Sequence, residues 1–237
     1  MEGDNPLLRR EEAWRGRYCL LARNGETSAS LSRNGGGVSP SNGPAYDVPT
    51  GRRDGEVSNV SLADDMPDVR DSIQQLKTKF FLKGLSDKDL ASASLRCPYI
   101  GTTACFFMMK RLYNFFPGGS GGSDPAINPR FLPELKSICP ENGDVNVRLS
   151  IDHGSERRFD KQILQNIKDG FAVLESDSKL NDDIVTKTVI DSYVGFLNPI
   201  FGPSFEADFV ESIVKMGQIG VKTGLQGQIR RVCAAFN

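Results

Sequence analysis

Apolar residues recur with helical spacing along most of the chain. Between Val69 and Phe80 they fall on one face, which predicts a helix ended by Gly84, and Ser86 predicts the N-cap of a second helix. The same reasoning predicts helices over Thr102–Phe116, Pro129–Cys139, Phe159–Asp169, Asp182–Phe196 and Ser204–Met216. Alternation with a period of two is almost absent, so we predict an all-α fold with long irregular connections.

The first 43 residues differ from the rest. The stretch 23–43 is rich in Gly and Ser and has neither helical nor strand periodicity, which predicts disorder. We therefore divide the chain into a segment 1–43 and a helical domain 44–237. The first ten residues carry charges and a proline but no apolar stretch, so no secretory signal is expected there.

Composition excludes some function classes. The net charge of −1 gives no argument for binding nucleic acid or an acidic membrane. No apolar run reaches the length of about 18 residues that a membrane-spanning helix needs. The five cysteines are scattered without CxxC spacing, which allows either two disulfides and one thiol or five thiols.

Candidate chemistry is concentrated in one polar stretch. His153 is the only histidine in the sequence, so neither a histidine metal cluster nor a two-histidine dyad can form. Around it, Asp152–Asp160 reads DHGSERRFD, with Ser155 between two carboxylates. Carboxylate, hydroxyl and carbonyl oxygens of a flexible loop are calcium ligands. The alternative is a polar loop in which Asp160 or Ser155 caps the next helix.

A series of short motifs, in order, extends over residues 40–237. They are Gly43–Asp54 (GPAYDVPTGRRD), Gly84–Leu90 (GLSDKDL), Ile100–Phe115 (IGTTACFFMMKRLYNF), Cys139-Pro140, Asp152–Asp160, Leu174–Asp177 (LESD), Lys215–Gly217 (KMG) and Gly227–Asn237 (GQIRRVCAAFN). In sequence and spacing they resemble motifs of the class III secretory plant haem peroxidases. Each motif alone is weak, but their shared order is specific.

The resemblance implies an incomplete haem-peroxidase-like helical fold, because the family's distal N-terminal half has no counterpart here. It implies haem and calcium as cofactors, with hydrogen peroxide as the oxidant and small phenols as one-electron donors. It further implies a secreted monomer of the apoplast, cell wall or vacuole that acts in hydrogen peroxide removal, oxidative stress and cell-wall chemistry. No nucleic-acid or membrane partner is expected.

The resemblance also assigns roles to individual residues. Asp177 corresponds to the aspartate that orients the histidine bound to haem iron. The proximal calcium ligands would be Asp152, Ser155, Asp160 and the main-chain oxygen of Arg158. The aromatic donor site would include Pro67 and Phe107, and a disulfide would join Cys105 to Cys139.

The sequence departs from the family at the haem ligand. The family motif is DLVxLS, followed by two small residues and then by HTIG. In this chain Asp89–Gly101 reads DLASASLRCPYIG, which contains no histidine. The position of the family's histidine falls at Cys97/Pro98. Codons for Ala91–Tyr99 can be chosen that, read one base later, encode Leu-Val-Leu-Leu-Ser-Ala-Ala-His and the start of a threonine codon. A local frame error would therefore explain the difference.

Without that histidine and the distal Arg and His, we predict that this chain is inactive. The alternative function is a degenerate protein without turnover, which is either calcium-binding or inert. A Cys97 thiolate on haem iron is a further alternative.

Overall fold

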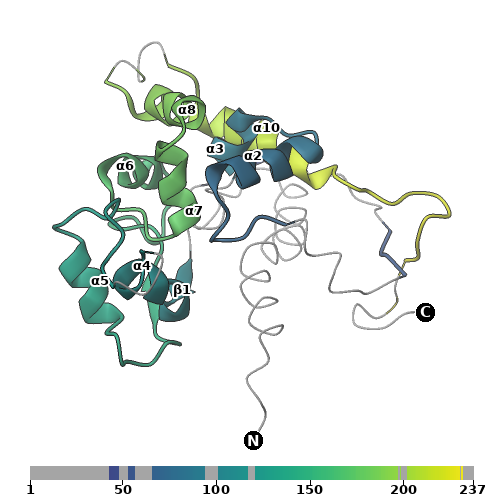
Figure 1. Cartoon of the computed structure of the whole chain (residues 1–237). Coiled ribbons are helices and arrows are strands. Elements are labelled where there is room, and N and C mark those ends of the chain that lie inside the picture. Colours follow the sequence, from purple (N-terminus) through teal and green to yellow (C-terminus); the bar gives the residue numbers. More distant parts are fainter. Residues whose placement is uncertain are drawn as a thin grey trace, which may run out of the picture.

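The structure is a computed structural model that describes residues 43–47, 53–56, 66–93, 101–116, 121–196, 198, 202–229 and 231. Short helices dominate it (Figure 1). They are α2 (Ile73–Leu82), α3 (Asp87–Ala93), α4 (Met109–Tyr113), α5 (Leu132–Ile138), α6 (Gln162–Asp169), α7 (Glu175–Ser178), α8 (Ile184–Val194) and α10 (Phe205–Gly217), with 3-10 turns η4 (Cys105–Phe107) and η5 (Lys179–Asn181). The predicted helical class is confirmed.

Helix ends follow local side-chain chemistry. Ser72 caps α2 in a capping box with Gln75, so this helix begins later than the apolar pattern suggested. Gly84 adopts a φ of 76° directly after the last turn of α2, as the sequence predicted. The hydroxyl of Ser86 accepts a hydrogen bond from the Asp89 amide at 3.2 Å, which confirms it as the cap of α3.

The predicted helix over Thr102–Phe116 is wrong in its first half. Residues Thr102–Ala104 form strand β1, which pairs antiparallel with β2 (Arg148–Ser150), Thr103 facing Leu149. β-branched threonines favour an extended backbone, and a partner strand 46 residues later supplies the hydrogen bonds. The chain then turns through η4 into α4, so the apolar run is divided among three elements.

The α5, α6 and α8 helices are shorter than their predicted ranges, whereas α10 has the predicted length and begins one residue later. Asp183 caps α8 through the amides of Val185 and Thr186, and Ser204 caps α10. The α6 helix ends at Gly170, whose φ is 80°. A Cβ there would lie 3.0 Å from the carbonyl oxygen of Ala126, so glycine is needed both for its conformation and for the close approach.

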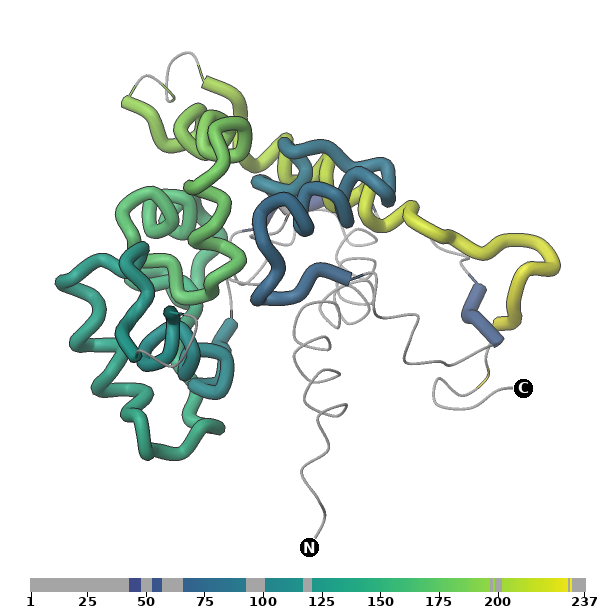
Figure 2. Tube along the Cα trace, in the orientation of Figure 1, coloured from purple at the N-terminus to yellow at the C-terminus, as the bar shows by residue number. Residues whose placement is uncertain are grey.

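Two apolar clusters form the core. The larger one joins buried side chains of α2, α3, α6, α8 and α10, and α3 packs against both α8 and α10. The smaller one joins η4, α4, α5 and β2. In Figure 2 the helices of the second cluster lie at one end of the drawn trace, below α6 of the first cluster. Along the chain, the loop 152–160 connects β2 of the smaller cluster to α6 of the larger one, and α7 follows Ala172 and Val173, which belong to one cluster each.

Candidate functional site

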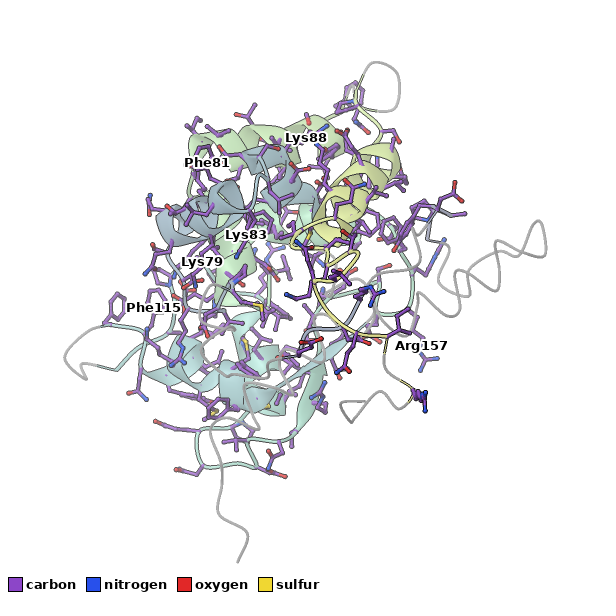
Figure 3. All side chains as sticks on the ribbon, turned by 90° about the vertical axis from the view of Figure 1, so that its right-hand side faces the viewer. Lys79, Phe81, Lys83, Lys88, Phe115 and Arg157 are labelled. Carbon is purple, nitrogen blue, oxygen red and sulfur yellow. A yellow bond between two sulfur atoms is a disulfide. The ribbon has the colours of Figure 1, made fainter. Side chains whose placement is uncertain are left out.

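The candidate calcium loop runs from Asp152 to Asp160, between β2 and α6. Strand β2 fixes its start, and the hydroxyl of Ser150 donates to the Asp152 carbonyl at 3.1 Å. Gly154 turns the chain with a φ of 85°. The side chain of Arg157 is exposed on the outer side of this loop (Figure 3). Within the loop Asp152 is buried and Asp160 half-buried, whereas Glu156, Arg157 and Arg158 are exposed.

Asp152 is the buried carboxylate of the loop. Its side chain is 0% exposed, and its Oδ1 accepts a hydrogen bond from Asn166 Nδ2 at 2.7 Å. Its Oδ2 is buried and has no hydrogen-bond partner within the described part of the chain. Burial, followed by the negative charge of Asp160, raises the pKa of Asp152 to about 7. A buried, half-satisfied carboxylate is costly, and a bound cation would offset that cost.

Asp160 closes the loop. Its Oδ1 accepts the amide of Gln162 at 2.8 Å, which satisfies a free N–H of the first turn of α6. Its Oδ2 accepts the hydroxyl of Ser155, and the amide of Arg158 donates to the Ser155 carbonyl at 3.3 Å. The N-cap residue is Lys161, so neither Asp160 nor Ser155 is the cap that the alternative predicted. One oxygen of Asp160 binds a first-turn amide of α6 and the other faces the loop, so this contact is compatible with the calcium interpretation.

The oxygen donors of this loop match the chemistry of calcium. Carboxylate, hydroxyl and main-chain oxygens are ligands that Ca²⁺ takes in sets of 6–8. In the residues that the structure describes, no group of three or more His, Cys, Asp or Glu side chains could hold a metal ion. The donors here are two carboxylates, a hydroxyl and carbonyls, which suit calcium and not a transition metal.

Asp177 lies at the junction of the two clusters. It is 3% exposed within α7, which follows the buried segment Ala172–Leu174. The Arg111 guanidinium holds this segment by donating to the carbonyls of Ala172 and Val173, the latter at 2.6 Å. Asp124 neutralises the arginine, with Oδ2 2.6 Å from Arg111 Nε. A buried ion pair between two elements thus fixes the start of the helix that carries Asp177.

His153 contacts two phenylalanines and a glutamate. Its ring lies 4.8 Å from that of Phe131 and 5.3 Å from that of Phe171, and its Nε2 lies 3.4 Å from Glu134 Oε2. The expected ligand position at Cys97/Pro98 lies outside the described residues. The only histidine of the sequence is thus held in the candidate calcium loop by these three side chains, and the sequence contains no second histidine that could bind haem iron.

The other predicted site residues are spread over several elements. The expected disulfide between Cys105 and Cys139 is present, with both residues 1% exposed. Pro67 lies before α2 and Phe107 in η4, both half-buried. Phe107 contacts the ring of Phe106, and in the described residues we find no hydrogen bond or ring contact that joins Phe107 to Pro67. Their shared role as a donor site stays a prediction.

Sequence reasoning missed Asn166 and Arg111. Asn166 is 3% exposed and interrupts the apolar face of α6 beside Ile163 and Ile167. Arg111 is 1% exposed within the apolar-aromatic run that ends at Phe116. A polar residue at a core position of an amphipathic pattern is the signal that could have identified both, since such groups are buried only with partners.

Comparison with known proteins places this arrangement in a family. A family model described as peroxidase matches residues 25–195. The chain belongs to the peroxidase family. It is 68% identical to Peroxidase 43 of Arabidopsis thaliana over 200 residues, 84% of this chain and 60% of the relative. It is 50% identical to Peroxidase 13 of the same plant over equal shares, and 43% identical to Peroxidase N1 of Nicotiana tabacum over 82% of the chain and 58% of the relative.

These matches confirm the resemblance to plant peroxidases and the helical fold. This peroxidase chain spans about three fifths of the length of these relatives. The family match begins at residue 25, within the segment 1–43, and the boundary between residues 43 and 44 stays a prediction. None of the described helices is long and apolar enough to cross a bilayer.

Proposed function

We propose that this chain is the proximal part of a secreted peroxidase that reduces hydrogen peroxide and oxidises small phenolic donors one electron at a time. Membership in the peroxidase family is the observation that carries this proposal. Haem would supply the redox chemistry, and the protein would supply the axial ligand and the groups that orient it. The buried Asp177, held at the junction of the two clusters, is the residue for orienting an axial histidine.

In this proposal the chain itself has no peroxidase activity. His153, its only histidine, lies among Phe131, Phe171 and Glu134. The segment Leu90–Tyr99 stands where the family carries its histidine. A frame error that begins near Ala91 and is reversed near Ile100 accounts for the difference, because the neighbouring frame can encode the family motif. The alternative, a non-catalytic protein that keeps only the calcium loop, is favoured by the intact donor set of Asp152, Ser155 and Asp160.

Haem uptake tests the frame interpretation. The chain as written is compared with a variant in which Leu90–Tyr99 is replaced by Leu-Val-Leu-Leu-Ser-Ala-Ala-His-Thr, and with a control that carries alanine in place of the new histidine. Haemin titration followed at the Soret band is expected to give a saturable complex for the histidine variant alone. None of the three is expected to oxidise guaiacol with hydrogen peroxide, because the distal Arg and His are not part of this sequence.

Two results would contradict the frame interpretation. One is a saturable Soret complex of the chain as written, which would point to Cys97 or another ligand. The other is a transcript whose codons for Ala91–Tyr99 do not encode the histidine motif one base later. Equal haemin binding by the histidine variant and its alanine control would show that the new histidine is not the iron ligand.

The calcium site is the second part of the proposal. Asp152, Ser155, Asp160 and the main-chain oxygen of Arg158 would hold one Ca²⁺. The buried Oδ2 of Asp152, which has no hydrogen-bond partner among the described residues, supports this assignment. So does the electrostatic repulsion between Asp152 and Asp160, which a divalent cation would reverse. Calorimetric titration with calcium chloride tests the site, and Asp152→Asn is expected to lose binding.

A further inference from the structure

We infer that Asn166 is a positioning residue of the calcium loop, whose buried amide holds Asp152 by one carboxylate oxygen and leaves the other available to the cation. This inference rests on the proposed calcium site. Asn166 lies on α6, outside the loop, and it is none of the expected ligands. Its side chain is 3% exposed, so its polar atoms depend on protein partners.

The orientation of the Asn166 amide follows from its three partners. Its Oδ1 accepts from Gln162 Nε2 at 3.1 Å, which directs the nitrogen toward the loop. Its Nδ2 then donates to Asp152 Oδ1 at 2.7 Å and to the His153 carbonyl at 2.9 Å. An amide nitrogen has two donors and the oxygen is an acceptor, so this arrangement uses both donors. If the amide were flipped, its oxygen would face two other acceptors, the Asp152 carboxylate and the His153 carbonyl, and would be repelled by both.

Asp152 and Asp160 are each held by α6 through one carboxylate oxygen. Asp152 is bound through Oδ1 by Asn166, and Asp160 is bound through Oδ1 by the amide of Gln162. Among the described residues, the Oδ2 of Asp160 accepts the rotatable hydroxyl of Ser155, and the Oδ2 of Asp152 has no hydrogen-bond partner. One oxygen of each carboxylate is thus committed to the helix and the other is presented to the loop.

The arrangement prepares the loop before the cation arrives. Two carboxylates that repel one another would separate in a flexible loop, and bringing them together would reduce the affinity for calcium. The first two turns of α6 hold the two side chains in place. Part of the free energy needed to bring the carboxylates together is therefore supplied by folding and not by calcium binding. Hydrogen-bond partners that orient metal ligands typically change metal affinity by about 10- to 100-fold when they are removed.

Calorimetry on the whole chain tests this inference. The variant Asn166→Ala is expected to bind Ca²⁺ about 10- to 100-fold more weakly than the parent. The matched control is Gln165→Ala, which removes the neighbouring amide that bonds to Asp169 on the exposed side of α6. Its affinity is expected to equal that of the parent. Gln162→Met removes the partner that orients Asn166 and is expected to weaken binding by about fivefold, as loss of one neutral hydrogen bond does.

Thermal unfolding separates positioning from a general structural role. A structural role of Asn166 would lower Tm equally in calcium and in EDTA, whereas a positioning role reduces the increase in Tm that calcium produces. Equal calcium affinity of the parent and Asn166→Ala would overturn the inference and leave the calcium site standing. No calcium uptake by the folded parent would overturn the calcium site itself. If Asn166→Ala does not fold, unchanged affinity of Gln162→Met would overturn the inference.

Discussion

Single residues in this chain illustrate how a buried charge is tolerated. Asp89 is 1% exposed at the start of α3. Burial by itself would raise its pKa, but hydrogen bonds from Ser212 and Ser86 and the charge of Lys215 hold the pKa below the ordinary carboxyl value. Ser212 belongs to α10, and its hydroxyl also contacts that of Ser92 at 2.8 Å. A charged residue thus connects α3 to α10 through neutral hydroxyl groups.

Asp89→Asn is expected to lower the free energy of unfolding by about 2 kcal/mol at pH 7, since a charged hydrogen-bond acceptor is lost. The folded-state pKa lies below the unfolded one, so the stabilisation is present above about pH 4 and is lost as pH falls through the folded pKa. Urea unfolding of parent and variant at pH 7 and at pH 3 measures this.

The difference between parent and Asp89→Asn should shrink at the lower pH. Asp169→Asn, on the exposed end of α6, serves as the control and should stay within about 0.5 kcal/mol of the parent. A constant difference between pH 7 and pH 3 would show that the Asp89 charge is not what stabilises the contact between α3 and α10.

At the scale of elements, ion pairs determine which segments meet. Lys88 of α3 pairs with Asp208 of α10 at 2.8 Å near the surface, where Figure 3 labels it. Such exposed pairs contribute little. The buried pair of Arg111 and Asp124 differs, because it joins α4, the loop that follows it and the segment before α7. The Nη2 of Arg111 has no hydrogen-bond partner in the described residues, so this nitrogen loses its hydration without a replacement. The pair therefore fixes the position of these segments but costs desolvation free energy.

Arg111→Met is expected to destabilise the chain by about 3–5 kcal/mol, because it leaves the buried Asp124 carboxylate without its cation. Chemical denaturation followed by circular dichroism measures the loss. Adding Asp124→Asn to the first substitution should recover part of it, since the remaining charge is then removed. Lys110→Met, at an exposed site of the same helix, is the control, and an equal effect of the two single substitutions would contradict this account.

At the scale of the whole molecule, the two apolar clusters have different sources of stability. The larger one relies on packing between five helices. The smaller one contains the Cys105–Cys139 disulfide, which closes a loop with a sequence separation of 34 and links η4 to the end of α5. In the chain-entropy account a loop of this length contributes about 4 kcal/mol. Short helices such as α4 and α5 are marginal alone and depend on that link.

Replacing both half-cystines, Cys105→Ala with Cys139→Ala, is therefore expected to lower stability by about 4 kcal/mol. Hydrogen exchange followed by mass spectrometry should rise most in α4 and α5 and least in α3 and α10, because the disulfide lies wholly within the smaller cluster. The oxidised parent is the reference. A uniform rise over all helices would instead show that the two clusters unfold together.

Sequence alone determined much of this protein, because helical periodicity and end caps are local. The helical class, the cap at Ser86 and the family were all predicted, and so was the disulfide through the family resemblance. The helix predicted from Thr102 was wrong, because the strand at that place depends on β2, a distant segment.

Only the tertiary structure decided how the polar residues are used. It placed Asn166 against Asp152 and Arg111 against the segment before α7, pairings separated by 14 and by more than 60 positions along the chain. It also placed His153 against the rings of Phe131 and Phe171. Local propensity carries no information on such contacts, since a buried polar group is stable only where the fold brings a partner to it.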